Sequence, residues 1–195
     1  GKSTLLKMLA GVVEPDSGAR VTGLNVKTGY FSQHRDGMLD PRRTVLQEAM
    51  DNHRLNPELM VRTVLGTFLF PGDNVFKKCG VLSGGEKSRL SLVKLLLDPP
   101  NVLLMDEPTT HLDMPSVDAL IGALKEFEGT LCFISHDLYF INALADHVAH
   151  IEQGKVTMYP GNYEYFQYRQ EQLKAEAEGT SSVSSPAAEP ALSPE

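Results

Sequence analysis

Apolar residues along the chain follow two periods, which predict two kinds of secondary structure. Residues 102–105 and 131–134 are apolar at every position, as expected of parallel strands that are covered on both faces. After Ser116, which can cap a helix, the spacing becomes helical and the apolar positions are Val117, Leu120, Ile121, Leu124 and Phe127. Because buried strands alternate with amphipathic helices, the pattern predicts an α/β fold built on a mostly parallel sheet.

The beginning of the chain predicts one helix and two short strands. Residues 3–10 form the candidate helix, and Gly11 can end it in the left-handed conformation that is common at helix ends. A turn at residues 15–18 is followed by strand candidates at residues 19–22 and 27–31. The second strand runs into Gln33, so the pattern places this side chain in a loop directly after a strand.

A helical segment is inserted before residue 102. Thr44 can cap a first helix, and Asn56 with Pro57 offers a cap and a first-turn proline for a second. A third helix begins near Ser83, and the residues along one of its sides are Leu90, Val93, Leu96 and Leu97. We expect a helical subdomain over about residues 40–97.

The end of the chain predicts a hairpin, a helix and a tail. Residues 148–151 and 155–158 flank a Gln-Gly turn and indicate an edge hairpin. Residues 163–178 are polar with aromatic residues near their start, so we expect a helix that is docked at its beginning and solvated later. Residues 179–195 are rich in Ser, Pro and Ala and predict a disordered tail.

Composition and charge narrow the class of protein. Lys and Arg number 18 against 25 Asp and Glu, and the net charge of −7 disfavours indiscriminate binding to nucleic-acid backbones or anionic lipid. No apolar run approaches the roughly 18 residues of a membrane-crossing helix, and no export signal is evident. Cys79 and Cys132 match neither a disulfide framework nor a metal site, so we expect structural thiols, with Cys132 buried in its strand. These features predict a cytoplasmic protein with no membrane partner.

The chain opens with Gly1-Lys2-Ser3-Thr4, the second half of a phosphate-binding consensus. Backbone N–H groups at a helix start attract phosphate, the lysine can reach the outer phosphates, and the serine hydroxyl can ligate Mg²⁺. The alternative is an ordinary capped surface helix. The first glycine of the consensus and the strand before it would lie upstream, so we expect an N-terminally truncated chain in which the first P-loop strand is missing.

Acidic and imidazole groups follow the two fully apolar strands. Asp106 and Glu107 come after one strand and His136 after the next, so they should emerge at the sheet edge where open α/β folds bind ligands. Asp106 could hold Mg²⁺, Glu107 could polarise an attacking water, and His136 could donate to a γ-phosphate oxygen. The alternatives are a pair of helix-capping carboxylates before Pro108 and a surface histidine.

Leu82-Ser83-Gly84-Gly85-Glu86 is a second candidate anion site. Two adjacent glycines expose backbone N–H groups at a helix start, and the serine hydroxyl can donate as well. This site would be additional to the candidate phosphate cradle at the beginning of the chain. An ordinary capped helix is again the alternative.

In their order along the chain, these motifs resemble those of the ATP-binding-cassette (ABC) ATPases, from Gly1 to about Phe166. The segments that carry the resemblance are Gly1-Lys2-Ser3-Thr4, Gln33, Leu82-Ser83-Gly84-Gly85-Glu86, Asp106-Glu107-Pro108, His111-Leu112-Asp113 and Ser135-His136-Asp137. Together with Tyr139-Phe140 and Pro160-Gly161-Asn162-Tyr163, they look like the ABC-F branch. That branch consists of soluble proteins that carry two cassettes in tandem and mostly act on ribosomes during translation. The resemblance implies a P-loop NTPase fold of the ABC type, with a helical subdomain that carries the signature motif.

The resemblance also implies a role for each matching residue. The phosphates of ATP and its Mg²⁺ would be held by Gly1, Lys2, Ser3 and Thr4. Asp106 and Gln33 would complete the metal site, and Gln33 would sense metal and water. Glu107 would be the general base and His136 the switch residue. Asp113 would belong to the loop that links two sites, and a nucleotide held by a different cassette would be contacted by Ser83, Gly84, Gly85 and Glu86.

Two positions depart from the pattern of the branch. Thr110 stands where asparagine is usual, and Leu138 stands where arginine is usual. Neither departure removes a catalytic group. The aromatic residue that stacks on adenine in this superfamily would lie upstream of Gly1, so whether this chain alone binds or hydrolyses ATP stays open.

The resemblance thus implies an ATP-hydrolysing cassette, the second of a tandem pair, that pairs with another cassette and acts on the ribosome. Residues 1–160 would form the ATPase domain, residues 161–178 a C-terminal helix and residues 179–195 the tail. The ATPase subunit of an ABC transporter shares every catalytic motif and is the main alternative. A chromosome or DNA-repair ATPase would need long coiled-coil arms between Gln33 and Ser83, which only 50 positions separate. A binding module without activity is the remaining alternative.

Overall fold

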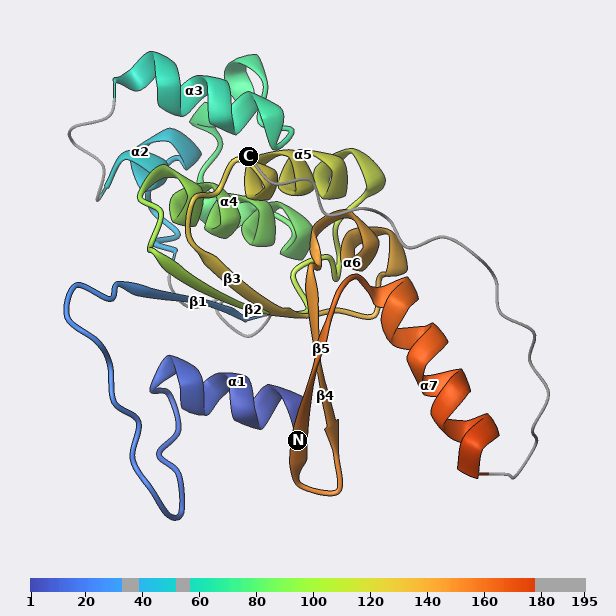
Figure 1. Cartoon of the computed structure of the whole chain (residues 1–195). Coiled ribbons are helices and arrows are strands. Elements are labelled where there is room, and N and C mark those ends of the chain that lie inside the picture. Colours follow the sequence, from blue (N-terminus) through green and yellow to red (C-terminus); the bar gives the residue numbers. More distant parts are fainter. Residues whose placement is uncertain (33–38, 52–56, 178–195) are drawn as a thin grey trace, which may run out of the picture.

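The computed structural model describes residues 1–32, 39–51 and 57–177 and contains a three-stranded parallel sheet (Figure 1). Its strands are, in spatial order, β1 (Thr28–Ser32), β2 (Val102–Asp106) and β3 (Thr130–Ile134). Asp106 pairs in register with Ser32 on one side and Ile134 on the other, so the three strands end at a common edge. The predicted α/β fold with a parallel sheet is confirmed, while Gln33 lies outside the described residues.

The helices between and after these strands account for most of the remaining structure. In chain order they are α1 (Lys2–Ala10), α2 (Val45–Met50), α3 (Glu58–Thr67), α4 (Gly84–Leu97), α5 (Met114–Lys125), α6 (Leu138–Leu144) and α7 (Tyr163–Ala177), with 3-10 helices η1 (Gly72–Phe76) and η2 (Cys79–Val81). Within the described residues, no helix has both the length and the apolar character that a bilayer span requires.

Helices cover both faces of the sheet (Figure 1). On one face, Leu6 of α1 forms a small cluster with Tyr30 of β1 and Leu104 of β2. On the other face, Leu103 and Met105 of β2 enter the main core together with residues of α4 and α5. Successive side chains of a strand point to opposite faces, so β2 is buried from both sides, as its unbroken apolar sequence predicts.

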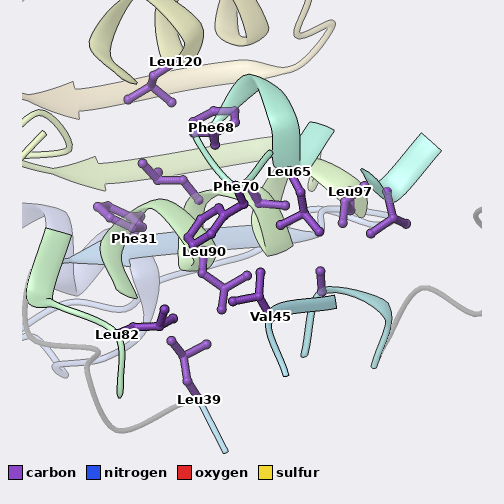
Figure 2. Close-up of a cluster of buried hydrophobic side chains, with 14 of the residues drawn as sticks. Phe31, Leu39, Val45, Leu65, Phe68, Phe70, Leu82, Leu90, Leu97 and Leu120 are labelled. Carbon is purple, nitrogen blue, oxygen red and sulfur yellow. The ribbon is translucent and has the colours of Figure 1, made fainter. Parts of the chain in front are cut away.

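The segment between β1 and β2 is helical, as predicted, and supplies much of the main core (Figure 2). Thr44 begins α2 through a capping box with Gln47, and Ser83 begins α4 at the predicted position. Pro57 is the N-cap of α3, and Asn56 lies outside the described residues. Figure 2 shows how side chains of this segment meet those of β1 and α5; among them are Phe31, Leu65, Phe68, Phe70, Leu90 and Leu120.

The predicted hairpin is present as β4 (His147–Glu152) and β5 (Lys155–Pro160), which are antiparallel. In the described part of the chain the two strands pair only with each other and do not extend the parallel sheet. Phe166 of α7 packs against the hairpin, with its ring centre 5.1 Å from that of Tyr159 and 5.3 Å from that of His150. Later residues of α7 such as Leu173 are exposed, so the helix is docked at its start and solvated afterwards, as expected.

Several expectations from the sequence are wrong. The N-cap of α5 is Asp113, and Ser116, the predicted cap, lies inside the helix. Residues 19–22 form no strand, because nothing in the described structure pairs with them, and Val21 is 89% exposed. Cys132 is exposed although its neighbours in sequence are apolar. It lies opposite Leu104, on the face that α1 covers. β3 is one of the two edge strands of the sheet, and α1 packs against β2 and the other edge strand, β1. Cys79 is buried in the main core, in agreement with its predicted structural role.

A buried ion pair joins two helices of this segment. Glu48 of α2 is only 2% exposed, and its carboxylate pairs with the ammonium group of Lys94 on α4. Arg43 lies 3.8 Å from the other carboxylate oxygen. Removing one partner of a buried pair is costly, because the remaining charge has lost its hydration without compensation.

Lys94→Met should therefore lower the free energy of unfolding by about 3–5 kcal/mol, as measured by urea denaturation. The control is Lys27→Met, since Lys27 forms a 2.7 Å ion pair with Asp98 in which both side chains are more than half exposed. That variant should lose less than about 1 kcal/mol. Equal losses of unfolding free energy in the two variants would contradict the idea that burial makes the Glu48–Lys94 pair costly to break.

Candidate functional site

The first turn of α1 lies beside the end of β2. The Ser3 hydroxyl donates a 3.1 Å hydrogen bond to Oδ1 of Asp106, which joins two predicted site residues 103 positions apart. α1 packs on β1 and β2, so the sheet holds the start of this helix at the edge where its strands end. The structure thereby brings the predicted phosphate-binding turn and the predicted metal carboxylate together.

The start of α1 is suited to bind an anion. Gly1 is the N-cap, no side chain caps the helix, and its first turn contains no acidic residue. Lys2, Ser3 and Thr4 are all exposed in this turn. The first N–H groups of a helix lack intrahelical partners and carry partial positive charge, so a phosphate can take the place of a capping side chain.

Glu107 has an unusual backbone conformation at the end of β2. Its φ is +51°, in the left-handed region that costs a residue other than glycine about 1–2 kcal/mol. Its N–H donates a 2.9 Å hydrogen bond to the carbonyl of Ile134, the last residue of β3. This bond holds the turn at Glu107 against the loop that follows β3.

Glu107 and His136 contact each other across these two loops. The backbone N–H of His136 donates to Oε2 of Glu107 at 3.3 Å, and Nε2 of the imidazole lies 3.5 Å from Oε1. The Glu107 side chain is 24% exposed and that of His136 is 80% exposed. The carboxylate is thus partly shielded from water and oriented by a donor, whereas the imidazole faces the outside, where a ligand could reach it.

Ser3 and Asp106 offer the oxygen ligands that Mg²⁺ prefers. Proteins commonly hold Mg²⁺ through one or two side chains, and waters and substrate phosphates fill the other positions. The pair fits this pattern, and residues 1–32, 39–51 and 57–177 contain no cluster of three or more His, Cys, Asp or Glu side chains that could cage a metal. The third predicted ligand, Gln33, is not among them.

The segment that begins at Ser83 forms a capped helix start, which we call the signature corner (Ser83, Gly84 and Gly85). Oγ of Ser83 accepts the N–H of Glu86 at 3.3 Å, and Oε2 of Glu86 accepts the N–H of Ser83 at 2.8 Å. The bond from this backbone N–H lowers the pKa of Glu86. The Glu86 carboxylate therefore serves the cap, while Ser83 and Gly84 remain exposed to solvent.

The two candidate anion sites are not joined within this chain. Among the described residues, no hydrogen bond or ion pair connects the signature corner with residues 1–4. Asp113, the predicted linking residue, caps α5: its carboxylate accepts the hydroxyl and the N–H of Ser116. The bond from this hydroxyl is the largest cause that lowers the pKa of Asp113.

Arg89 is a site neighbour to which the sequence motifs do not point. Its Nη1 lies 3.9 Å from Oδ1 of Asp113. The available signal is its place on α4, because it follows Gly85 by one helical turn and precedes the fully buried Leu90. A charged side chain at that place needs a specific partner, but the sequence does not say which.

Known proteins resemble this chain in sequence. A family model described as ABC transporter matches residues 1–110. The chain is 46% identical over 177 residues to the putative ATP-binding protein YdiF of Bacillus subtilis, covering 90% of the chain and 27% of that protein. It is 42% identical over 183 residues to the energy-dependent translational throttle protein EttA of Escherichia coli K12 (91% and 33%). It is 38% identical over 187 residues to ABC transporter F family member 5 of Arabidopsis thaliana (91% and 27%). The chain thus spans a third or less of the length of these relatives.

Two solved structures share the fold. An RNase-L Inhibitor structure matches with a TM-score of 0.68 and 27% sequence identity. The match covers 89% of this chain and 35% of the RNase-L Inhibitor chain. A chain from the complex of archaeal ribosomal stalk protein aP1 with the archaeal ribosome recycling factor aABCE1 matches with a TM-score of 0.69 and 27% identity. This match covers 89% of the present chain and 34% of the other. Similarity to an F family member supports the predicted ABC-F branch. Because the family model covers more than half of the sequence and the fold agrees, the chain belongs to the ABC transporter family of ATP-binding-cassette ATPases.

Proposed function

We propose that this chain hydrolyses ATP as one cassette of a pair, with each nucleotide held between the first turn of α1 in one cassette and the signature corner of the other. The meeting of two contacts at one sheet edge carries the proposal: Ser3 bonds to Asp106, and Glu107 contacts His136. Phosphoryl transfer to water needs a phosphate cradle, a metal carboxylate and a water-positioning group side by side. The residues that we propose for these three roles lie at this edge.

Each side chain at the edge has a role that its position supports. Lys2 and the N–H groups at the start of α1 would bind the β- and γ-phosphates. Ser3 and Asp106 would hold Mg²⁺, which supplies positive charge to the phosphate oxygens when bound. Glu107 would accept a proton from the attacking water, and the exposed imidazole of His136 beside it would contact the γ-phosphate.

The signature corner supports a second cassette as the partner. Ser83 and Gly84 are exposed, and among the described residues no hydrogen bond or ion pair connects the signature corner with the phosphate-binding turn of its own chain. Two large apolar side chains next to the site are also exposed: Met114, directly after Asp113, is 58% exposed, and Leu138 is 52% exposed. Apolar side chains beside a polar site are typical of a surface that another protein covers. Gln33, which lies outside the described residues, would sense the metal and water of the closed pair.

We further propose that the paired cassettes act on the ribosome, and hence in the cytoplasm. One relative is named a translational throttle, and one structural neighbour is a ribosome recycling factor in complex with a ribosomal stalk protein. Binding of ATP would close the pair, and hydrolysis would reopen it by removing the γ-phosphate that both cassettes contact, because a ligand shifts an equilibrium only through differential contacts. The ATPase subunit of a transporter would share the site and differ in its partner.

Glu107→Gln in the full-length protein should slow ATP turnover by roughly 10²–10⁴-fold while ATP binding is retained, because the amide keeps the shape of the side chain but cannot accept a proton. Phosphate release and equilibrium titration with ATP measure the two quantities. Glu128→Gln, at an exposed position outside the site, is the control and should leave turnover unchanged. A normal rate for Glu107→Gln would reject Glu107 as the base.

Ser83→Arg should abolish the ATP-dependent pairing of cassettes and leave ATP binding intact, because a long charged side chain would obstruct the exposed signature corner. Analytical ultracentrifugation with and without ATP measures the pairing. Ser17→Arg changes an exposed turn and should behave like the unaltered protein. If Ser83→Arg responded to ATP in the same way, the signature corner would not contact a second cassette.

The Glu107→Gln protein, held in its ATP-bound state, should sediment with ribosomes through a sucrose cushion and should lose this association without ATP. The membrane fraction of the same cells is assayed in parallel. Recovery with an integral membrane subunit instead of ribosomes would favour the transporter alternative.

A further inference from the structure

The loop between β2 and α5 packs against the first turn of α4 in the same chain. This loop, residues 107–113, begins with Glu107 and ends with Asp113. A Cβ atom on Gly85 would lie 3.0 Å from the carbonyl oxygen of His111, which is tighter than most side-chain contacts. Glycine at this position thus lets the signature corner approach the loop of its own cassette.

Arg89 makes a second contact between the same two segments. It lies one turn after Gly85 on the same side of α4, and its Nη1 is 3.9 Å from Oδ1 of Asp113. The Arg89 side chain is only 15% exposed, whereas that of Asp113 is 52% exposed. Because water is largely excluded from one side of this ion pair, its attraction is screened less than that of a fully exposed pair.

The remainder of the Arg89 side chain is enclosed by the core. Its guanidinium carbon lies 5.9 Å from the ring centre of Phe70, within the range of cation–π attraction. Its Nε is buried and has no hydrogen-bond partner in the described part of the chain. A buried donor without a partner is unfavourable, so packing alone gives little reason for an arginine here. The contact with Asp113 gives one.

Asp113 connects this contact to the site. Its carboxylate holds the start of α5 through Ser116, and the loop that it closes runs back to Glu107. Glu107 has a φ of +51°, and such a conformation persists only where the surrounding structure enforces it. Asp113 is the other end of the same loop, so a restraint on Asp113 limits the conformations that this loop can adopt.

We propose that Arg89 is a positioning residue that, by holding Asp113, fixes the loop of Glu107 against the helix of the signature corner. The inference rests on the proposed function, in which Glu107 serves the nucleotide of this cassette and the signature corner serves that of the partner cassette. The two surfaces then move as one body, and each chain couples two nucleotides through a rigid contact. Arg89 touches neither nucleotide and acts through Asp113.

Arg89→Met in the full-length protein tests this proposal, because methionine keeps an apolar contact with Phe70 and removes the charge. We expect kcat for ATP to fall about tenfold with little change in KM, and amide hydrogen exchange of residues 107–113 to accelerate. Arg89→Lys should recover part of kcat because it restores the charge.

Arg62→Met is the matched control. Arg62 also forms an ion pair, 2.7 Å from Glu58, and also lies over an aromatic ring, 5.1 Å from the centre of Phe76. Its partners belong to α3 and η1 and not to the loop at the site. We therefore expect an unchanged kcat and unchanged exchange of residues 107–113.

Unchanged kcat and unchanged exchange in Arg89→Met would overturn the proposal. So would faster exchange spread evenly over the helical segment, because that pattern reports lost packing alone. If Arg89→Met does not fold, a double-mutant cycle with Arg89→Lys and Asp113→Asn tests the proposal. Losses in kcat that are less than additive in the double variant support the coupling between Arg89 and Asp113, and additive losses overturn it.

Glu107→Gln, measured alongside, separates this inference from the proposed function. Normal turnover in Glu107→Gln contradicts the proposed function. Slow turnover in Glu107→Gln combined with normal turnover in Arg89→Met contradicts the role of Arg89 alone.

Discussion

The hydrogen bond from Ser3 to Asp106 joins the start of α1 to the end of β2, and the geometry of the candidate site depends on this juxtaposition. The bond is exposed, so by itself it adds little to stability. Packing maintains the position, because Leu6 of α1 is buried against Tyr30 and Leu104 of the sheet. A phosphate cradle alone could bind any small anion, and the neighbouring carboxylate makes it suitable for a phosphate that carries Mg²⁺.

A strained backbone at Glu107 and an exposed side chain at His136 occur together where the chemistry is proposed. Glu107 adopts a left-handed conformation, and the bond from its N–H to Ile134 stabilises that turn. His136 is mostly exposed, although it follows a strand of apolar residues. Such features persist because the elements behind them are firmly packed: Met105, one residue before Asp106, is completely buried. The well-packed strand therefore supports an edge that is not optimised for stability.

The starts of α1 and α4 show two uses of the N–H groups that have no partner within a helix. No side chain caps α1, so its first N–H groups remain available for a ligand. Ser83 and Glu86 cap α4 reciprocally, so that helix start keeps its shape without a ligand. The first is suited to bind a phosphate directly, and the second to present a preformed surface to a nucleotide bound elsewhere. Arg89 and Asp113 tie the second surface to the loop of Glu107.

The sequence by itself determined the order and type of most elements, because residues 102–105 are apolar enough to be buried on both faces and because Ser83 can cap a helix. It also indicated that Asp106, Glu107 and His136 would emerge at one edge of the sheet, since parallel strands end at a common edge. Only the tertiary structure decided that Cys132 is exposed and that Arg89 forms an ion pair with Asp113. A pattern of residues reports what each residue prefers, whereas burial and ion pairing depend on which element lies next to it, and distant parts of the chain supply that element.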